Sequence, residues 1–228
     1  SPMVVDGVEG IGQYGGTWRM GTRGGGDEVI YVRTAGYQNL VRWDVDWTGV
    51  IPDVAESFEV NEEGTVFTFN LREGMKWSDG APYPADDILF AINDLYLNAD
   101  VYPAPPTWLV SGGEPGVAEK LDDYTVQFTF AAPNGLFMQQ LATPNTSAVV
   151  AQPKHYLSQF HATYADADEL AAAAAEAGVE SWQDLLNQKG GSVAGRPNTL
   201  WSNAELPTVN PWMTVNPLAP DATQVRLT

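Results

Sequence analysis

Two histidines and several carboxylates are the side chains of this chain that could bind a metal ion. His155 and His161 precede Asp166 and Asp168, and imidazole and carboxylate are common ligands of Zn²⁺. A spacing of six residues places the two histidines on different sides of a helix, and no second ligand motif supports them. We therefore predict that no metal is bound and that both histidines lie at the surface.

Catalytic motifs are nearly absent. Asp86 and Asp87 could act as paired carboxylates in acid–base chemistry, but they follow Pro84, which suits the first position of a helix. The helix dipole favours negative charge there, and this explains both acids. The chain has no Gly-x-Ser-x-Gly, no phosphate-binding glycine loop with a lysine, and no cysteine nucleophile. The sequence therefore favours a protein that is not an enzyme.

Aromatic residues in loops are better candidates for contact with a ligand. Tyr102 and Trp108 lie in a loop at residues 101–108 that prolines stiffen, and Trp212 is a third candidate. Flat rings bury the apolar faces of sugars or side chains, while loop amides bind polar groups. Two interpretations of Trp108 stay open: its ring contacts a ligand, or it packs under its own loop.

A glycine-rich stretch at residues 21–26 also has two interpretations. Its spacing fits neither a dinucleotide-binding loop nor a Walker motif. It is either an ordinary loop after a strand, or a loop whose glycines let a ligand approach the backbone closely.

Composition excludes several classes of partner. The net charge of −18 repels phosphate backbones and anionic lipid heads, so we expect no nucleic-acid partner and no membrane-surface partner. No run of about 18 apolar residues is present, so we expect no insertion into a membrane. The absence of cysteine excludes disulfides and thiolate chemistry and is compatible with an oxidising compartment.

The secondary structure expected around these residues alternates strands and helices. In residues 65–71, Phe67, Phe69 and Leu71 alternate with polar residues, which predicts a strand with one buried face. Turns are expected at 61–64, where Gly64 can take positive φ, and at 77–80, where a side chain in place of Gly80 would clash. A hairpin is expected at 117–130, turning at 122–123.

The other expected elements complete an α/β chain long enough to bury roughly 70% of its unfolded surface. Helices are expected at 84–96, with a buried stripe at 88, 91, 92, 95 and 96, and at 133–141, 152–160, 166–177 and 181–187. A strand is expected at 224–228.

Four short motifs follow one another between residues 51 and 98. They are Pro52-x-x-Ala55-Glu56-Ser57, Phe67-x-Phe69-x-Leu71-Arg72-x-Gly74, Trp77-Ser78-Asp79-Gly80 and Ala85-Asp86-Asp87. This series resembles the bacterial extracellular solute-binding proteins of the oligopeptide-binding type, family 5. The resemblance implies a protein that captures a solute outside the cytoplasmic membrane and delivers it to an ATP-driven importer. The motif residues themselves are interpreted as scaffold.

The resemblance also implies an architecture. It is an α/β fold of the periplasmic binding protein-like class II, with a mixed sheet and an inserted α+β subdomain. Residues 1–48 and 196–228 would form part of ligand-binding lobe I, and residues 49–195 the inserted subdomain. A second lobe would lie beyond Thr228, so that the chain is an N-terminal fragment with an incomplete fold.

The site residues that the resemblance implies come from three segments. Residues 15–21 resemble the first strand of the family, and the loop after it contributes Thr22, Arg23 and Gly24. The aromatic loop contributes Tyr102 and Trp108. The return strand at 206–213 contributes Asn210 and Trp212, although Asn210 stands where the family usually has glycine. No cofactor and no metal are implied.

The solute and the partners follow from the same resemblance. We expect a small solute, an oligopeptide bound through its backbone as an added strand, and the membrane permease of an ABC transporter as partner. An oligosaccharide is the alternative, which the aromatic run at residues 43–47 also suits. From other classes, a secreted glycoside hydrolase and a sensor lobe without transport remain open. The location implied is periplasmic or extracellular, with a lipid anchor possible only through a region outside this chain.

Overall fold

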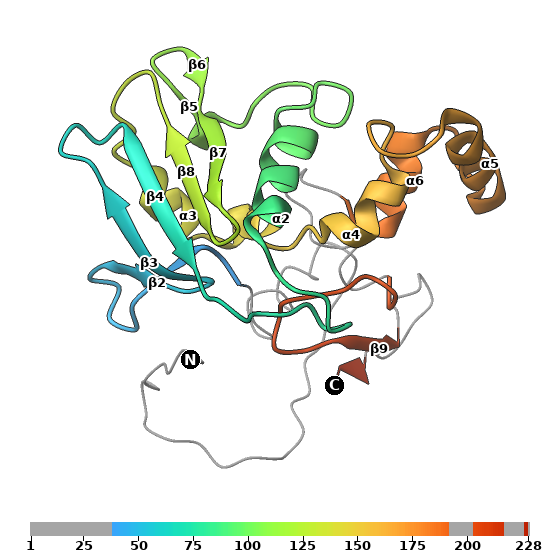
Figure 1. Ribbon diagram of the computed structural model, residues 1–228, viewed down its shortest axis with the longest axis horizontal. Coiled ribbons are helices and arrows are strands. Elements are labelled where there is room, and N and C mark those ends of the chain that lie inside the picture. Colours follow the sequence, from blue (N-terminus) through green and yellow to red (C-terminus); the bar gives the residue numbers. More distant parts are fainter. Residues whose placement is uncertain (1–37, 192–202, 217–225, 228) are drawn as a thin grey trace, which may run out of the picture.

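A four-stranded antiparallel sheet lies on one side of the computed structural model, at the left in Figure 1. The structure describes residues 38–191, 203–216 and 226–227. The strands of this sheet are β3 (Ala55–Val60), β4 (Val66–Leu71), β8 (Thr125–Thr129) and β7 (Val117–Asp122), in that order. The strand expected at 15–21 and the candidate residues Thr22, Arg23 and Gly24 lie outside the described residues.

The two faces of this sheet differ in polarity because its strands alternate apolar and polar residues. On β4, Phe67, Phe69 and Leu71 are buried. On the opposite face, Asn70 donates a hydrogen bond to Ser57 of β3 at 2.9 Å. The strand predicted at 65–71 and the hairpin predicted at 117–130 are therefore confirmed, and every strand pairing among the described residues is antiparallel.

Helices cover the apolar face of the sheet. They are α2 (Ala85–Leu89), which continues as the π-helix η2 (Phe90–Tyr96), and α3 (Phe137–Leu141). The ring of Phe137 packs edge-on against Phe67 and Phe130, each at 4.8 Å between ring centroids. The helix predicted at 84–96 is confirmed with its buried stripe, but Pro84 caps it instead of opening it. The helix predicted from residue 133 begins only at Phe137. Before it, Asn134 is held by other segments, its N–H donating to the carbonyl of Gly64 at 2.9 Å and its side-chain amide to the carbonyl of Trp108 at 3.0 Å.

A group of short helices extends from one end of the sheet (Figure 1). It contains η4 (Pro144–Val149), α4 (Lys154–Leu157), η5 (Ser158–Phe160), α5 (Ala167–Ala177) and α6 (Trp182–Lys189). Asp166 caps α5 by accepting hydrogen bonds from the N–H groups of Asp168 and Glu169, and Gly178 ends that helix with φ 72°. Ser181 caps α6. The helices predicted at 152–160, 166–177 and 181–187 are thus confirmed.

The remaining elements are short. They are the hairpin β1 (Val41–Trp43) and β2 (Val50–Pro52), the 3-10 helix η3 (Thr107–Leu109), the pair β5 (Val110–Ser111) and β6 (Glu114–Pro115), and the pair β9 (Thr214–Asn216) and β10 (Arg226–Leu227). The strand predicted at 206–213 is wrong in position, since this segment is irregular and a strand begins only at Thr214. Pro207 and Pro211 lack the N–H that a ladder requires.

None of the helices that the structure describes is long and apolar enough to cross a membrane.

Replacement of Phe137 by alanine tests whether its ring organises the core. Because the side chain is fully buried among the rings of the sheet, we expect F137A to lower the free energy of unfolding by about 3–5 kcal/mol. Its neighbour Leu136 is 65% exposed, so L136A should change this free energy by less than about 0.5 kcal/mol. Urea unfolding followed by circular dichroism measures both, and equal losses in the two variants would contradict the assignment.

Candidate functional site

A cavity of about 190 Å³ lies between a tight corner of the chain and the segment at residues 203–213. Asn210 and Trp212, two of the residues expected to contact a ligand, belong to its lining. The Trp212 side chain is 47% exposed, so its ring is available at the mouth of the cavity. The described lining consists of Ser78, Asp79, Asn203, Ala204, Glu205, Leu206, Pro207, Thr208, Asn210, Trp212 and Met213.

The corner is a narrow turn made by residues 76–82. Trp77 N–H donates to the carbonyl of Ala81, and Gly80 N–H donates back to the carbonyl of Trp77, each at 2.9 Å. Gly80 has φ +91°, and a Cβ there would meet open space. The expected clash at this position is therefore wrong: glycine is required by the left-handed backbone and not by a neighbouring atom.

Hydrogen bonds hold the segment against the corner. Ser78 N–H donates to the carbonyl of Thr208 at 2.9 Å, and Thr208 N–H donates to Ser78 Oγ at 3.0 Å. The hydroxyl of Thr208 in turn accepts the N–H of Asn210 at 3.0 Å. The position of Asn210 in the cavity lining thus depends on Ser78, a residue far away in the sequence.

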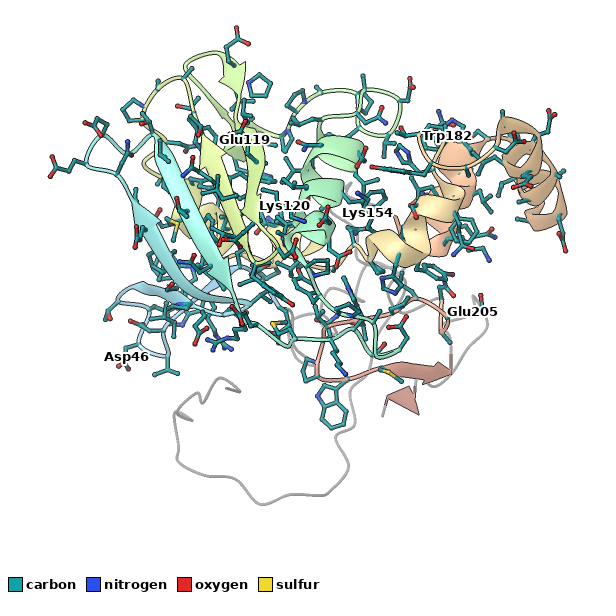
Figure 2. The ribbon with its side chains drawn as sticks, viewed as in Figure 1. Asp46, Glu119, Lys120, Lys154, Trp182 and Glu205 are labelled. Atoms are coloured by element: carbon teal, nitrogen blue, oxygen red, sulfur yellow. The ribbon has the colours of Figure 1, made fainter. Side chains whose placement is uncertain are left out.

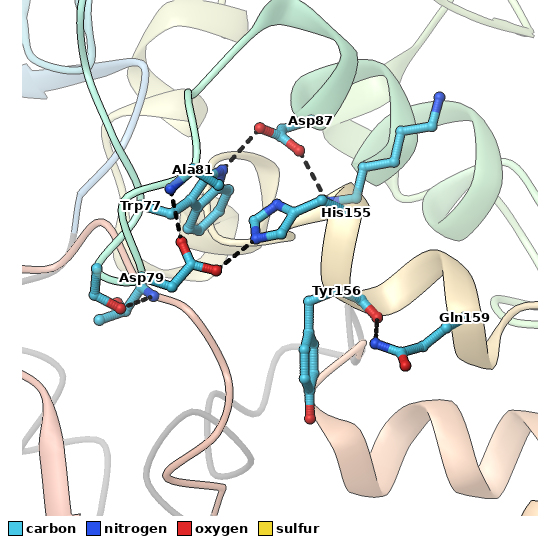
Figure 3. Close-up of polar contacts among 10 residues, drawn as sticks. Trp77, Asp79, Ala81, Asp87, His155, Tyr156 and Gln159 are labelled. Atoms are coloured by element: carbon cyan, nitrogen blue, oxygen red, sulfur yellow. Dashed lines mark hydrogen bonds and ion pairs between the residues drawn. The ribbon is translucent and has the colours of Figure 1, made fainter.

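The buried carboxylate of Asp87 holds the corner from the interior of the protein. The indole Nε1 of Trp77 donates to Asp87 Oδ2 at 2.9 Å, and the backbone N–H of Lys154 donates to Asp87 Oδ1 at 2.8 Å (Figure 3). Asp87 is only 3% exposed. Burial raises its pKa to about 6, although the two hydrogen bonds act in the opposite direction.

The preference of a helix start for negative charge therefore does not account for both Asp86 and Asp87. Asp86 fits that interpretation and pairs with Lys120 at 2.6 Å near the surface, whereas Asp87 links α2 to the corner and to α4. Successive residues of a helix point about 100° apart. One of two adjacent acids can consequently face the interior while the other faces water.

His155 holds the corner from the side. Its Nε2 lies 2.8 Å from Asp79 Oδ2, while Asp79 Oδ1 accepts the N–H of Ala81 at 3.0 Å (Figure 3). Partial burial raises the pKa of Asp79, but the hydrogen bonds from Ala81 and His155 and the charge of His155 outweigh it, and the pKa is lowered. His155 lies at the surface, as predicted.

His161 contradicts the surface prediction, because it is fully buried. Its Nε2 lies 3.0 Å from the carbonyl of Asp94, and its Nδ1 accepts the N–H of Thr163 at 3.2 Å. Both ring nitrogens therefore have partners inside the protein, and the ring packs edge-on against Trp182 at 4.9 Å. In the part of the chain that is described, no three His, Cys, Asp or Glu side chains gather as metal ligands.

The two aromatic residues of the 101–108 loop lie elsewhere than in the cavity lining. The rings of Tyr102 and Trp108 pack edge-on against Tyr96, at 5.8 Å and 5.2 Å between centroids. Trp108 also stacks on Phe137 at 6.2 Å. These contacts match the interpretation in which Trp108 packs under its own loop. Contact of either ring with a ligand stays a prediction.

The structure adds cavity residues that the sequence interpretation did not single out. Ser78 and Asp79 belong to a motif assigned to the scaffold alone, while Asn203, Glu205 and Thr208 stand in a segment with little pattern. The Trp77-Ser78-Asp79-Gly80 motif was the signal that could have indicated these lining residues, because a rigid turn with two polar side chains can also form part of a cavity lining. Figure 2 places Glu205 close to the short helices and far from Asp46, at the tip of the β1–β2 hairpin.

Comparison with known proteins identifies relatives for most of the described chain. Residues 49–177 match the model of the middle part of the bacterial extracellular solute-binding proteins, family 5. The dipeptide-binding protein of Escherichia coli K12 is 37% identical over 124 residues, covering 46% of this chain and 22% of that protein. The periplasmic oligopeptide-binding protein OppA of the same organism is 30% identical over 190 residues, covering 76% and 32%.

A third relative binds a different kind of solute. The periplasmic alpha-galactoside-binding protein of Rhizobium meliloti is 33% identical over 126 residues, covering 55% of this chain and 18% of that protein. The chain thus spans a third or less of the length of these relatives.

Solved structures agree with this similarity. A structure of an oligopeptide-binding protein OppA has a TM-score of 0.85 and 39% identity, covering 99% of this chain and 33% of that one. The structure of the binding protein MelB from Agrobacterium fabrum C58 in complex with stachyose has a TM-score of 0.57 and 28% identity, covering 83% and 26%. The expected fold class, part of a periplasmic binding protein-like fold, is confirmed.

The buried carboxylate predicts a pH dependence of stability. The pKa of Asp87 rises from 3.8 to about 6 on folding, so the folded state binds this proton more tightly than the unfolded state. The resulting stabilisation is fully present below pH 3.8 and is lost as the pH rises through 6. It amounts to about 3 kcal/mol.

Urea unfolding between pH 4 and 8 measures this contribution. We expect D87N to lose this part of the pH dependence and D86N, the matched change at the surface, to retain it. An unchanged pH profile in D87N would show that Asp87 does not titrate as the structure indicates.

Proposed function

Because the chain belongs to the bacterial extracellular solute-binding proteins, family 5, we propose that it is part of a receptor for an ABC importer. In this proposal the receptor binds a small solute in the periplasm or outside the cell and presents it to the membrane permease, without catalysis of its own. The relatives named as periplasmic binding proteins support this reading.

The observation that carries the proposal is an open cavity that both polar and apolar side chains line. Its volume of about 190 Å³ is below the roughly 300–1,000 Å³ typical of small-molecule sites. Polar side chains such as Asn210 and Thr208 lie beside the half-exposed ring of Trp212. This is the combination that fixes polar groups of a ligand and covers its apolar faces.

We propose that the cavity is one wall of a larger site. The relatives are at least three times longer than the matched region, and their additional length would supply the facing wall. Two lobes that close by hinge motion would then enclose the solute. In this proposal residues 49–195 form the inserted subdomain, and residues 1–48 and 196–228 belong to the ligand-binding lobe.

An oligopeptide is the solute that we propose first. Relatives named for dipeptides and oligopeptides support it. The cavity wall at residues 203–213 is irregular, so its backbone groups are not all used in a sheet. An extended peptide binds through such backbone groups, with pockets for its side chains.

An oligosaccharide is the second candidate. One relative is named for alpha-galactosides and another was solved with stachyose. An exposed aromatic surface also favours it: Trp47 is 71% exposed and stacks on Trp43 at 5.8 Å. The glycoside hydrolase remains the alternative from another class, and cleavage of a glycan by the natural protein would establish it.

The natural protein that carries this chain tests the solute class. We expect its melting temperature to rise with members of a panel of di- to pentapeptides and not with raffinose or stachyose. The W212A variant should lose about tenfold in affinity, because a flat contact surface is removed. The control variant W47A removes a ring that is more exposed, 71% against 47%, and that lies outside the described cavity lining, so it should bind the peptide normally. A stronger response to the sugars would contradict the peptide proposal.

The 228-residue chain alone tests whether the cavity is an incomplete site. We expect calorimetry to detect no micromolar binding of a solute that the natural protein binds, because one wall buries too little of the ligand. Micromolar affinity of the isolated chain would contradict this expectation.

A further inference from the structure

We propose that His155 and Tyr156, two consecutive residues of α4, are positioning residues for the cavity. Neither residue belongs to the described lining. Each contacts a lining residue from a different segment of the chain, and together they hold the two segments at a fixed separation. This inference rests on the proposed function, because it assigns a task to the same cavity.

His155 holds the corner through Asp79. The distance of 2.8 Å between His155 Nε2 and Asp79 Oδ2 is that of a strong hydrogen bond or ion pair. The imidazole also packs against the buried ring of Trp77, 6.1 Å between centroids. The histidine therefore approaches Asp79 from a fixed direction (Figure 3).

Tyr156 holds the other segment through Asn203. The side-chain amide Nδ2 of Asn203 donates to the Tyr156 hydroxyl at 3.0 Å and to the carbonyl of Lys189 at 2.9 Å. Asn203 begins the described segment that also carries Thr208, Asn210 and Trp212. A shift of Tyr156 would therefore move the start of this wall.

Helix α4 can act as a rigid support because its own start is anchored in the core. Lys154 N–H donates to the buried carboxylate of Asp87 at 2.8 Å. Just before the helix, the hydroxyl of the fully buried Tyr83 donates to the carbonyl of Val150 at 3.0 Å. The core thus fixes α4, and α4 fixes both segments of the cavity wall.

The contact between His155 and Asp79 has an ionised acceptor. A hydrogen bond to a carboxylate is stronger than one between two neutral groups, so loss of the imidazole would remove one of the stronger contacts of the corner.

Hydrogen exchange in the absence of solute tests the positioning role directly. In the natural protein, we expect H155A and Y156F to accelerate exchange at residues 77–81 and 203–210 about tenfold, after correction for intrinsic rates. The amides of β4 and β8 should exchange as before. The control Q159A removes a hydrogen bond to the Tyr156 carbonyl and contacts neither Asp79 nor Asn203, so it should leave both segments unchanged.

The conservative variant H155Q separates positioning from a general loss of stability. A glutamine keeps a side-chain N–H donor for Asp79, so H155Q should exchange more slowly than H155A at residues 77–81. H155A should exchange faster than the parent protein. Exchange at residues 77–81 and 203–210 that is the same in H155A, Y156F and the parent would overturn the proposal.

The affinity for a solute found in the peptide and sugar panel is a separate readout. We expect H155A and Y156F to weaken it about tenfold without touching the ligand. Faster exchange with unchanged affinity would overturn the role of this cavity in binding. Unchanged exchange would overturn the positioning role, whatever the affinity, so the two failures are distinguishable.

Discussion

The buried carboxylate of Asp87 is the interaction on which the geometry of the site depends. It receives one hydrogen bond from the indole of Trp77 and one from the backbone of Lys154, and so joins the corner, α2 and α4. A carboxylate removed from water is costly unless its oxygens are satisfied. The partial compensation by two donors explains both why the group can be buried and why its pKa remains raised.

The aromatic core determines where this carboxylate lies. The rings of the sheet pack around Phe137, and α2 lies on the same sheet face with Ile88 fully buried. With Ile88 facing the core, the preceding residue Asp87 is turned toward the corner. The continuation of α2 as a π-helix keeps Ile92 and Leu95 buried over the remaining turns. The sheet therefore positions the helix, and the helix positions the carboxylate.

The shape of the cavity depends on the positions of the corner and of α4. The corner contributes Ser78 and Asp79, and the segment at 203–213 is attached to the corner through Ser78 and to α4 through Asn203. The lining is thus held at several points although it contains no regular secondary structure between residues 203 and 213. A wall of this kind can be rigid while its backbone groups stay available to a ligand.

The sequence by itself determined those features that depend on neighbouring residues. Alternation at Phe67 and Phe69 predicted a strand with one buried face, and the helices predicted at 166–177 and 181–187 agree with α5 and α6 to within two residues at each end. The order of the four motifs was enough to identify the family. Each of these signals is a short stretch of neighbouring residues, where local sterics and hydrogen bonding decide the conformation.

Only the tertiary structure decided which polar residues act together. His161 is buried and His155 is not, although their sequence surroundings predicted the same exposure. Asp87 joins residues on two other segments, and Ser78 pairs with Thr208, a partner 130 residues away. Contacts of this range depend on how helices and sheet pack, and no local periodicity encodes that packing. The scaffold was therefore readable from the sequence, whereas only Asn210 and Trp212 of the cavity lining were expected from it.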